Sequence, residues 1–263
     1  MKANTSNRFF AEERRRDIVK LVSKKGKATV EELGKRYNVS LPTIRADLAE
    51  LEAVHMVKRT HGGAIPAEKS AGFELTSAEK DIQNIDEKKA IAKAAFKLIN
   101  AGDVIFLDTG TTTRELANLL VNSAGITVIT NDIAISSILE NNKSINLTLI
   151  GGNIRKGFHC TVGPAAKEQM KTLYADKVFI AANALSEKRG LSTPSIENAD
   201  IKKQLIENAR ICIALVDSSK IGMEALCKFA ELCDIDVLVS DDRIDEKFSK
   251  KLKEGGTELI TAH

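Results

Sequence analysis

From residue 104 onward, short apolar runs alternate with segments of helical spacing, and this alternation restricts the fold more than any other feature of the chain. Six such runs occur, at residues 104–108, 126–130, 145–150, 177–183, 211–217 and 236–241. Apolar runs of this length are typical of strands buried on both faces, and intervening helices make such strands parallel. Residues 85–263 are therefore predicted to form an α/β domain with a parallel sheet.

The first 66 residues show helical spacing without apolar strands. Ile18, Leu21 and Val22 are three and four positions apart, which predicts an amphipathic helix over residues 11–24. Thr29 and Glu32 have the spacing of a capping box, in which each side chain bonds the backbone N–H of the other residue. A short second helix is expected to begin after Thr29.

A third helix is predicted after Ser40, with Ile44, Leu48 and Leu51 on its inner side. Two short helices joined by a tight turn fit a helix-turn-helix, whose second helix enters the major groove of DNA. Small outward residues allow close approach, an arginine can reach guanine or phosphate, and hydroxyls can bond to phosphate. The residues expected to contact DNA from these two helices are Thr29, Ser40, Pro42, Thr43, Arg45 and Ala46.

Asp47 lies nearer the inner side of this helix, so it is expected to pair with a basic neighbour rather than to face anionic DNA. The next segment, MVKRTHGGAIP, is interpreted as a wing over the DNA backbone, with a turn at its two glycines. Lys58, Arg59, Thr60 and His61 are its candidate contacts. For His61, a turn or capping role is the alternative to contact with a base.

The charge distribution supports a polyanion partner for the first 66 residues. They hold 14 Lys and Arg against 8 Asp and Glu, which leaves 25 against 28 for the remainder. The basic excess is therefore confined to the first quarter of the chain, as expected where double-stranded DNA docks. A solvated charged surface is the alternative interpretation.

Polar clusters follow the predicted strands directly, at the sheet edge where open α/β proteins bind ligands. The candidate ligand contacts are Asp108, Thr109, Gly110, Thr111, Thr112, Thr113, Asn131, Asp132, Gly151, Gly152, Arg155 and Lys220. The Gly-Thr-Thr-Thr run opens a helix and offers N–H groups and hydroxyls to an anion, with Arg155 and Lys220 as cations. It lacks the Gly-Lys-Ser/Thr of a nucleotide-hydrolysing loop.

Asp108, Asn131 and Asp132 are predicted to hold sugar hydroxyls. The same clusters are also compatible with purely structural roles. The threonines can simply cap the helix that they open, and Asp108 and Asp132 can cap the helices that follow them. Gly151 and Gly152 indicate a turn or a close backbone approach.

Several classes of protein and site are disfavoured. No run approaches the ~18 apolar residues of a membrane span, and the N-terminus lacks the apolar centre of a signal peptide, so a cytoplasmic protein is expected. The four cysteines show neither metal-ligand nor disulfide spacing, and no cofactor is indicated. Residues 66–84 lack a clean period and are predicted to be a linker, with at most a helical turn at its end, between domains 1–65 and 85–263.

The motifs resemble those of the DeoR family of bacterial transcription regulators. ERRRDIVKLV, VSLPTIRADLAELE and KRTHGGA, within residues 12–64, are similar to its winged helix-turn-helix. DTGTTT, TND, GG-x-x-R, GLSTPSIENADIKK and LVDSSKIG follow in the family's order across residues 85–260. The resemblance implies a Rossmann-like effector domain similar to ribose-5-phosphate isomerase, which senses a phosphorylated sugar and usually loosens DNA binding when occupied.

The resemblance implies that Asp108 to Thr113 lie at the phosphate of the ligand, with Asn131, Arg155 and Lys220 beside it. The sequence departs from the family pattern at three positions: His55, Ala181 and Ala184 stand where members usually or often have glycine. We expect His55 to affect how the recognition helix ends, and the two alanines to narrow or stiffen the ligand pocket.

The sequence thus predicts a ligand-controlled repressor of a sugar-related operon, assembled as a homo-oligomer, dimer or tetramer, and not an enzyme. One alternative is a sugar-phosphate isomerase, with Asp108, Asp132 or Glu197 as the base. The second alternative is a DNA-binding protein whose second domain only oligomerises.

Overall fold

The computed structural model describes residues 10–53, 56–67 and 71–263, and divides the chain into two compact units, Met1–Ser70 and Ala71–His263. The boundary between the two units falls within the expected linker of residues 66–84. Residues from Ala71 onward belong to the second unit, and helix α4 (Ser77–Asp81) lies within the expected linker. Hydrogen bonds and ion pairs hold this segment against the second unit, and such contacts leave no periodic pattern in the sequence.

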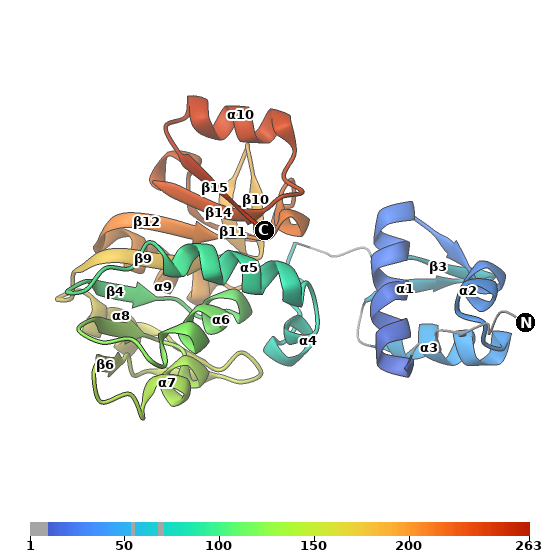
Figure 1. Ribbon diagram of the computed structural model, residues 1–263, viewed down its shortest axis with the longest axis horizontal. Helices are drawn as coiled ribbons and strands as arrows, with labels where there is room; N and C mark the ends of the chain where they lie inside the picture. Colours follow the sequence, from blue (N-terminus) through green and yellow to red (C-terminus); the bar gives the residue numbers. More distant parts are fainter. Residues whose placement is uncertain (1–9, 54–55, 68–70) are drawn as a thin grey trace, which may run out of the picture. The chain divides into compact units, whose positions relative to one another are not determined.

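The first unit is a winged helix-turn-helix of three helices and a small antiparallel sheet (Figure 1). Its elements are α1 (Ala11–Lys25), β1 (Ala28–Thr29), α2 (Val30–Tyr37), α3 (Leu41–Ala53), β2 (Val57–Thr60) and β3 (Gly63–Pro66). The sheet order is β1-β3-β2. The predicted apolar stripes of the three helices meet in one core that includes Ile18, Leu33, Ile44 and Leu48.

Local caps fix the boundaries of α2 and α3. The predicted capping box is confirmed: the Thr29 hydroxyl accepts from the Glu32 N–H at 3.1 Å, and the Glu32 carboxylate accepts from the Thr29 N–H at 2.9 Å. Asn38 ends α2 in the left-handed region, with φ 51°, a conformation that asparagine adopts more readily than most residues. The turn between the two helices therefore follows from residues that the sequence displays.

The second unit is built on a seven-stranded sheet whose neighbouring strands all pair in parallel. In spatial order its strands are β15 (Glu258–Ala262), β14 (Val237–Asp241), β12 (Ala209–Leu215), β9 (Ala175–Ala181), β4 (Val104–Leu107), β5 (Thr127–Thr130) and β6 (Asn146–Leu149). The six predicted apolar runs all coincide with strands of this sheet. The predicted parallel α/β domain is confirmed.

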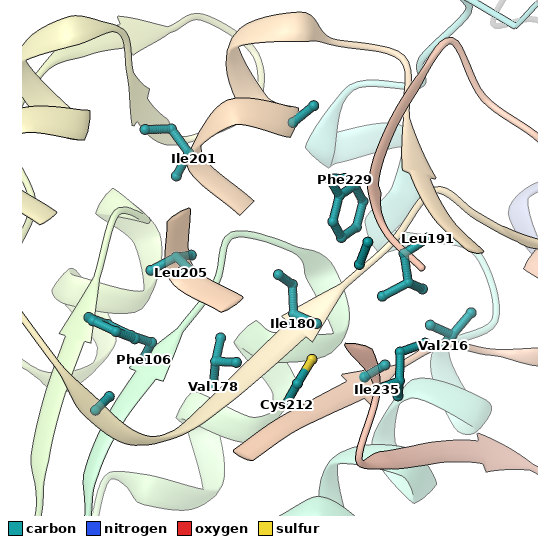
Figure 2. Close-up of a cluster of buried hydrophobic side chains, with 14 of the residues drawn as sticks. Phe106, Val178, Ile180, Leu191, Ile201, Leu205, Cys212, Val216, Phe229 and Ile235 are labelled. Carbon is teal, nitrogen blue, oxygen red and sulfur yellow. The ribbon is translucent and has the colours of Figure 1, made fainter. Parts of the chain in front are cut away.

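Helices cover both faces of the sheet, so the domain has two cores. Helices α5 (Ile85–Phe96), α6 (Thr111–Leu120) and α7 (Ile133–Leu139) contribute to one core. Helices α8 (Pro164–Met170), α9 (Ile196–Glu207) and α10 (Glu246–Glu254) contribute to the other. Strand residues alternate between the cores: Ile105 and Leu107 face the first, whereas Phe106 packs in the second with Val178 and Leu205 (Figure 2).

Short elements that the apolar pattern did not predict complete the second unit. They are the hairpin β7 (Asn153–Arg155) and β8 (Cys160–Val162), the sheet of β10 (Ala184–Ser186), β11 (Gly190–Thr193) and β13 (Cys227–Ala230), and the 3-10 turns η1 (Ser218–Lys220) and η2 (Leu232–Asp234). These strands are too short to show a period. Several of them follow the carboxyl ends of the main strands.

The strand order reverses between β4 and β9. From β4 the chain proceeds outward through β5 and β6, then returns to β9 on the other side of β4 and proceeds through β12 to β15. The connections on the two sides diverge at such a reversal, which leaves a crevice beyond the carboxyl ends of the strands. The fold therefore favours a ligand site beyond Leu107 and Ala181.

Candidate functional site

The outward face of α3 carries the residues predicted to read DNA. Pro42, Arg45 and Ala46 are exposed, and Thr43 is partly exposed, whereas Ile44 and Leu48 are buried beneath them. A face with one long cation between small side chains can approach a groove closely, because little bulk separates the helix backbone from the base edges. These residues share one surface.

The hydroxyls predicted to contact DNA also serve as caps. Ser40 Oγ lies 2.8 Å from Thr43 Oγ1 and accepts from the Thr43 N–H at 3.3 Å, which caps α3. One hydroxyl of this pair donates to the other, so one hydroxyl proton stays available for a phosphate oxygen. Thr29, exposed, caps α2 in the same way.

The wing is the hairpin of β2 and β3. Lys58, Arg59, Thr60 and His61 are all exposed on it or at its turn. Glu52, at the end of α3, orients Arg59. The backbone N–H of Arg59 donates to Glu52 Oε1 at 2.8 Å, and the guanidinium Nη1 of Arg59 lies 3.9 Å from Glu52 Oε2. The wing is therefore tied to the recognition helix. His55, expected to alter the end of that helix, lies outside the described residues.

Asp47 is a structural residue, as predicted. It is 2% exposed, and its carboxylate binds Arg14 Nε at 2.6 Å, Arg14 Nη2 at 3.1 Å and Arg15 Nε at 3.1 Å. The pairing joins α1 to α3 beneath the exposed face. Two of the three arginines just inside α1 are thus used to hold the recognition helix rather than to face solvent.

In the second unit, a pocket lies at the carboxyl ends of β4, β9 and β12, where the fold leaves a crevice. Six of the predicted ligand residues line it, namely Thr109, Gly110, Thr111, Thr112, Arg155 and Lys220. Among the described residues no side chain caps the N-terminus of α6, which begins at Thr111. Its first N–H groups therefore remain available to an anion.

The remaining six predicted residues do not line the pocket. They are Asp108, Thr113, Asn131, Asp132, Gly151 and Gly152. Asp108 is fully buried beneath the pocket, where its carboxylate pairs with Lys202 and accepts from the Ala181 N–H at 3.0 Å. Burial raises the pKa of Asp108, and the Lys202 ammonium opposes that rise. Asp108 thus takes part in a buried ion pair, while its Oδ1 has no hydrogen-bond partner among the described residues.

The side chains of Asn131, Asp132 and Thr113 bond to backbone groups of the protein, which need partners when they are buried. Asn131 donates to the Thr161 carbonyl at 2.9 Å, and Thr113 donates to the Gly110 carbonyl at 2.9 Å. Asp132 caps α7 through the N–H groups of residues 134 and 135 and accepts from the Thr109 hydroxyl at 2.7 Å. The capping alternative is therefore correct for Asp132.

Gly151 and Gly152 serve backbone packing, as their turn interpretation predicts. A Cβ at Gly152 would lie 2.7 Å from the Val162 carbonyl oxygen, a distance that allows no side chain. The Gly151 N–H donates to Gln169 at 3.1 Å. Of the two alanines expected to alter the pocket, Ala181 lines it and Ala184 is buried in β10.

The sequence missed most of the charged lining. Lys80, Lys88 and Lys202 line the pocket, as do Glu74, Asn183, Asn198 and Asp217. The three lysines lie on α4, α5 and α9, and no period or motif distinguishes them from the other lysines of the chain. Lys202, however, lies within GLSTPSIENADIKK, so the family resemblance could have suggested it.

Burial and charge perturb the lysines of the pocket. Burial lowers the pKa of Lys88 to about 8, an effect that Asp217 opposes and Lys220 increases. Burial also lowers the pKa of Lys80, against the attraction of Glu74. Cations crowded in a desolvated site are stabilised by an added anion. The pocket is therefore electrostatically suited to an anionic ligand.

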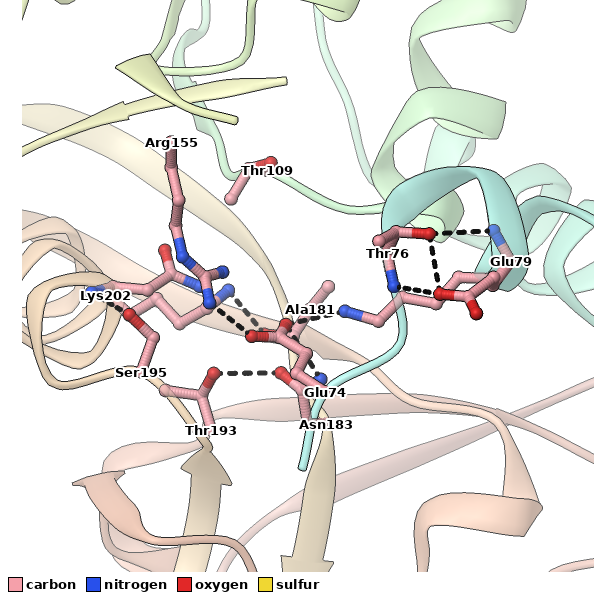
Figure 3. A network of polar contacts seen from close by, with 12 residues as sticks. Glu74, Thr76, Glu79, Thr109, Arg155, Ala181, Asn183, Thr193, Ser195 and Lys202 are labelled. Carbon is pink, nitrogen blue, oxygen red and sulfur yellow. Dashed lines mark hydrogen bonds and ion pairs between the residues drawn. The ribbon is translucent and has the colours of Figure 1, made fainter. Parts of the chain in front are cut away.

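Glu74 is the central acceptor of the pocket's polar network (Figure 3). Its carboxylate binds Lys80 Nζ at 2.6 Å, Arg155 Nη2 at 2.6 Å and Asn183 Nδ2 at 3.1 Å. Burial raises the pKa of Glu74, but Lys80 and Arg155 more than offset this, so the pKa lies below its ordinary value. Glu74 is thus an anion at neutral pH.

Comparison with known proteins decides the family. Residues 14–70 match the DeoR-like helix-turn-helix domain, and residues 83–242 match the DeoR C terminal sensor domain. The chain belongs to the DeoR family. As a member, it is a DNA-binding transcription regulator, and its α/β unit is the sensor domain. The predicted resemblance is confirmed.

DeoR-family relatives match the chain over nearly its whole length. The HTH-type transcriptional regulator GlpR of Haloferax volcanii is 35% identical over 94% of this chain and 96% of that protein. The lactose phosphotransferase system repressor of Streptococcus mutans is 34% identical over 95% and 98%. The HTH-type transcriptional repressor GlcR of Bacillus subtilis is 32% identical over 96% and 96%. Both units of the chain are therefore present in these relatives.

Among solved structures, a ribose 5-phosphate isomerase A from Methanocaldococcus jannaschii covers 53% of this DeoR-family chain and 55% of its own, with 23% identity and a TM-score of 0.40. A likeness this distant supports no conclusion about function. In the part of the chain that the structure describes, no helix is long and apolar enough to cross a membrane.

Proposed function

We propose that this regulator represses a carbohydrate-related operon, and that a phosphorylated small molecule in the sensor-domain pocket controls it. The observation that carries the proposal is that five cationic side chains line the same pocket as the uncapped N-terminus of α6, at the reversal of strand order. These are Lys80, Lys88, Arg155, Lys202 and Lys220. Relatives named as lactose phosphotransferase system repressors support the carbohydrate assignment.

The charge balance favours a dianion. While Glu74 is in place, three carboxylates stand against these five cations, Glu74 and Asp217 in the lining and Asp108 beneath it, which leaves two positive charges. A phosphate monoester carries roughly −1.5 to −2 charge at neutral pH, with a second pKa near 6. One phosphate group neutralises the pocket, and a carboxylate alone leaves it cationic.

The rest of the ligand is expected to carry hydroxyl groups. Asn198 is 3% exposed and lines the pocket, and its Oδ1 has no hydrogen-bond partner among the described residues. A buried amide oxygen without a partner costs about 1–3 kcal/mol, which a ligand hydroxyl would recover. Binding of sugar phosphates should therefore be tighter than binding of inorganic phosphate.

A thermal-shift panel tests the effector. A phosphorylated sugar present at 100 times its dissociation constant adds about 2.7 kcal/mol of stability. Matched unphosphorylated sugars are the controls and should give no shift. Absence of any shift across a broad phosphorylated panel would instead favour a domain that only oligomerises.

On DNA, α3 is proposed to enter the major groove while the wing lies over the backbone. Fluorescence anisotropy with the gene's own upstream region tests this, at several salt concentrations. Specific binding should weaken steeply as salt rises, because phosphate contacts release counterions. Binding that is indifferent to salt would contradict the proposal. Paired half-sites in the operator would further support a homo-oligomer, dimer or tetramer.

We do not propose catalysis. A sugar-phosphate isomerase would need one of three carboxylates, Asp108, Asp132 or Glu197, as its base. Asp108 is buried against Lys202, Asp132 caps α7, and Glu197 is exposed outside the pocket lining. A base must reach the carbon-bound proton of the substrate within hydrogen-bond distance. Turnover of any pentose phosphate or hexose phosphate by the purified protein would reinstate the enzyme alternative.

A further inference from the structure

Glu74 belongs to the pocket but also to the point where the chain enters the sensor domain. The sensor domain begins at Ala71, and we call residues 71–74 the entry segment. Its contacts with the sensor domain include two that bear on the pocket: the Ala71 carbonyl accepts from the Leu226 N–H at 2.9 Å, and Glu74 binds Lys80 and Arg155, each at 2.6 Å. The next residue, Leu75, is buried at 5% exposure.

The Glu74 carboxylate occupies donors that a bound phosphate would need. Lys80, Arg155 and Asn183, its three partners, all line the pocket. The Glu74 side chain is only 6% exposed, so little water screens it from a second anion in the same pocket. Two anions that share one guanidinium in a desolvated site repel each other.

We propose that Glu74 is an internal ligand of this pocket, that the anionic group of the effector displaces it, and that the displacement releases the entry segment. The inference rests on the proposed effector site and specifies how that site is regulated. Four extended residues span roughly 13 Å. Their release lengthens the connection to the DNA-binding unit by at most that amount. A longer connection lowers the effective concentration of one DNA-binding unit at the second half-site.

Isothermal titration with inorganic phosphate tests the competition. In Glu74→Gln, the amide keeps the size of the side chain and removes its charge. If the unliganded pocket has Glu74 displaced about a tenth of the time, this variant should bind phosphate about tenfold more tightly than the wild type. The control Glu168→Gln removes the charge of an exposed ion pair with Lys171 and should bind as the wild type does. Equal or weaker binding by Glu74→Gln would overturn the proposal.

Hydrogen exchange tests the release. The Leu226 amide, bonded to Ala71, should exchange faster in Glu74→Gln without ligand, and faster in the wild type with phosphate. The Ser77 amide donates to the Gly157 carbonyl at 2.9 Å, beyond the entry segment, and serves as the internal reference. Unchanged exchange at Leu226 in the variant would reject the internal-ligand role, even if phosphate binds neither protein. Failure of phosphate and sugar phosphates to bind either protein would reject the proposed effector site itself.

Discussion

Individual buried charges determine how both units respond to pH and to substitution. In the sensor domain, Lys88 has its pKa lowered from 10.5 to about 8 by burial. Between these two values the unfolded chain holds more protons than the folded one, so this group's contribution to stability increases with pH there. In the DNA-binding unit, Asp47 has two buried or half-buried arginine partners.

Lys88 should make anion binding depend on pH. A bound phosphate stabilises the charged ammonium, so affinity should be highest where the phosphate is a dianion and Lys88 is charged, and should fall as the pH rises through the pKa of Lys88, about 8. If phosphate raises that pKa by one unit, the loss is about tenfold. Titration calorimetry with inorganic phosphate between pH 7 and pH 10 measures it. Lys88→Met should bind less tightly at pH 7 and show a flatter pH profile; an unchanged profile would contradict this role.

Asp47→Asn should destabilise the DNA-binding unit. The substitution removes the carboxylate charge that faces Arg14, which is 7% exposed. Breaking a buried ion pair by removing one charge costs about 3–5 kcal/mol. Urea denaturation of the full chain measures the change. The control is Glu50→Gln, which removes the 58%-exposed partner of Arg15 and should cost less than about 1 kcal/mol. Equal effects of the two substitutions would show that burial of the pair is irrelevant.

At the scale of elements, the recognition helix and the wing act as one DNA-binding surface. Glu52, near the end of α3, holds Arg59 of β2, and β3 pairs with both β1 and β2. A substitution that distorts a strand of the wing should therefore lower the affinity for DNA, even where the altered residue does not contact DNA.

Gly63→Ala tests the wing. A Cβ at Gly63 would lie 2.1 Å from the Ala28 carbonyl oxygen, which the pairing of β1 with β3 cannot accommodate. Forced overpacking of this kind costs about 1–3 kcal/mol, so both thermal stability and operator affinity should fall. At the neighbouring Gly62 a Cβ meets no described atom within 4 Å. Gly62→Ala is thus the matched control, and a similar loss in both variants would refute the role of close packing at Gly63.

Arg45→Ala tests the recognition helix. Loss of a base or phosphate contact should weaken operator binding by about 1–3 kcal/mol without affecting the fold, because Arg45 is exposed. Anisotropy titrations on operator and unrelated DNA separate the two kinds of contact: a base contact relaxes specificity, whereas a phosphate contact weakens both. Arg210→Ala, which alters an exposed arginine of the sensor domain, should leave DNA binding unchanged.

For the whole molecule, separate cores predict separate unfolding. One hydrophobic cluster lies entirely within the first unit and two lie within the second. Calorimetry should resolve two transitions, and a phosphorylated sugar should raise the temperature of only the larger one. Asp47→Asn should lower only the smaller one. A single transition that shifts as a whole would show that the two units unfold together.

Patterns within a few residues were enough to predict the architecture. The Thr29–Glu32 capping box, the apolar stripes of α1 to α3 and six strands of the main sheet follow from local propensity and periodicity, which depend on near neighbours. The same reasoning placed Asp47 on the inner side of α3. Strand β15 and the small sheets were missed, because long-range contacts rather than a local period fix them.

The ligand pocket required the tertiary structure. Thr109 to Thr112, Arg155 and Lys220 could be proposed because they follow strands, yet Asp108 has the same position and points inward to Lys202, 94 residues away in sequence. Whether a polar side chain serves a ligand or a buried partner depends on what other elements bring opposite it. Glu74, Lys80 and Lys88 acquired their role only when α4 and α5 were packed against the strand ends. The sequence by itself determined the helices of the first unit, six strands of the main sheet and the family, because these depend on near neighbours, and folding decided which charges face one another across the pocket.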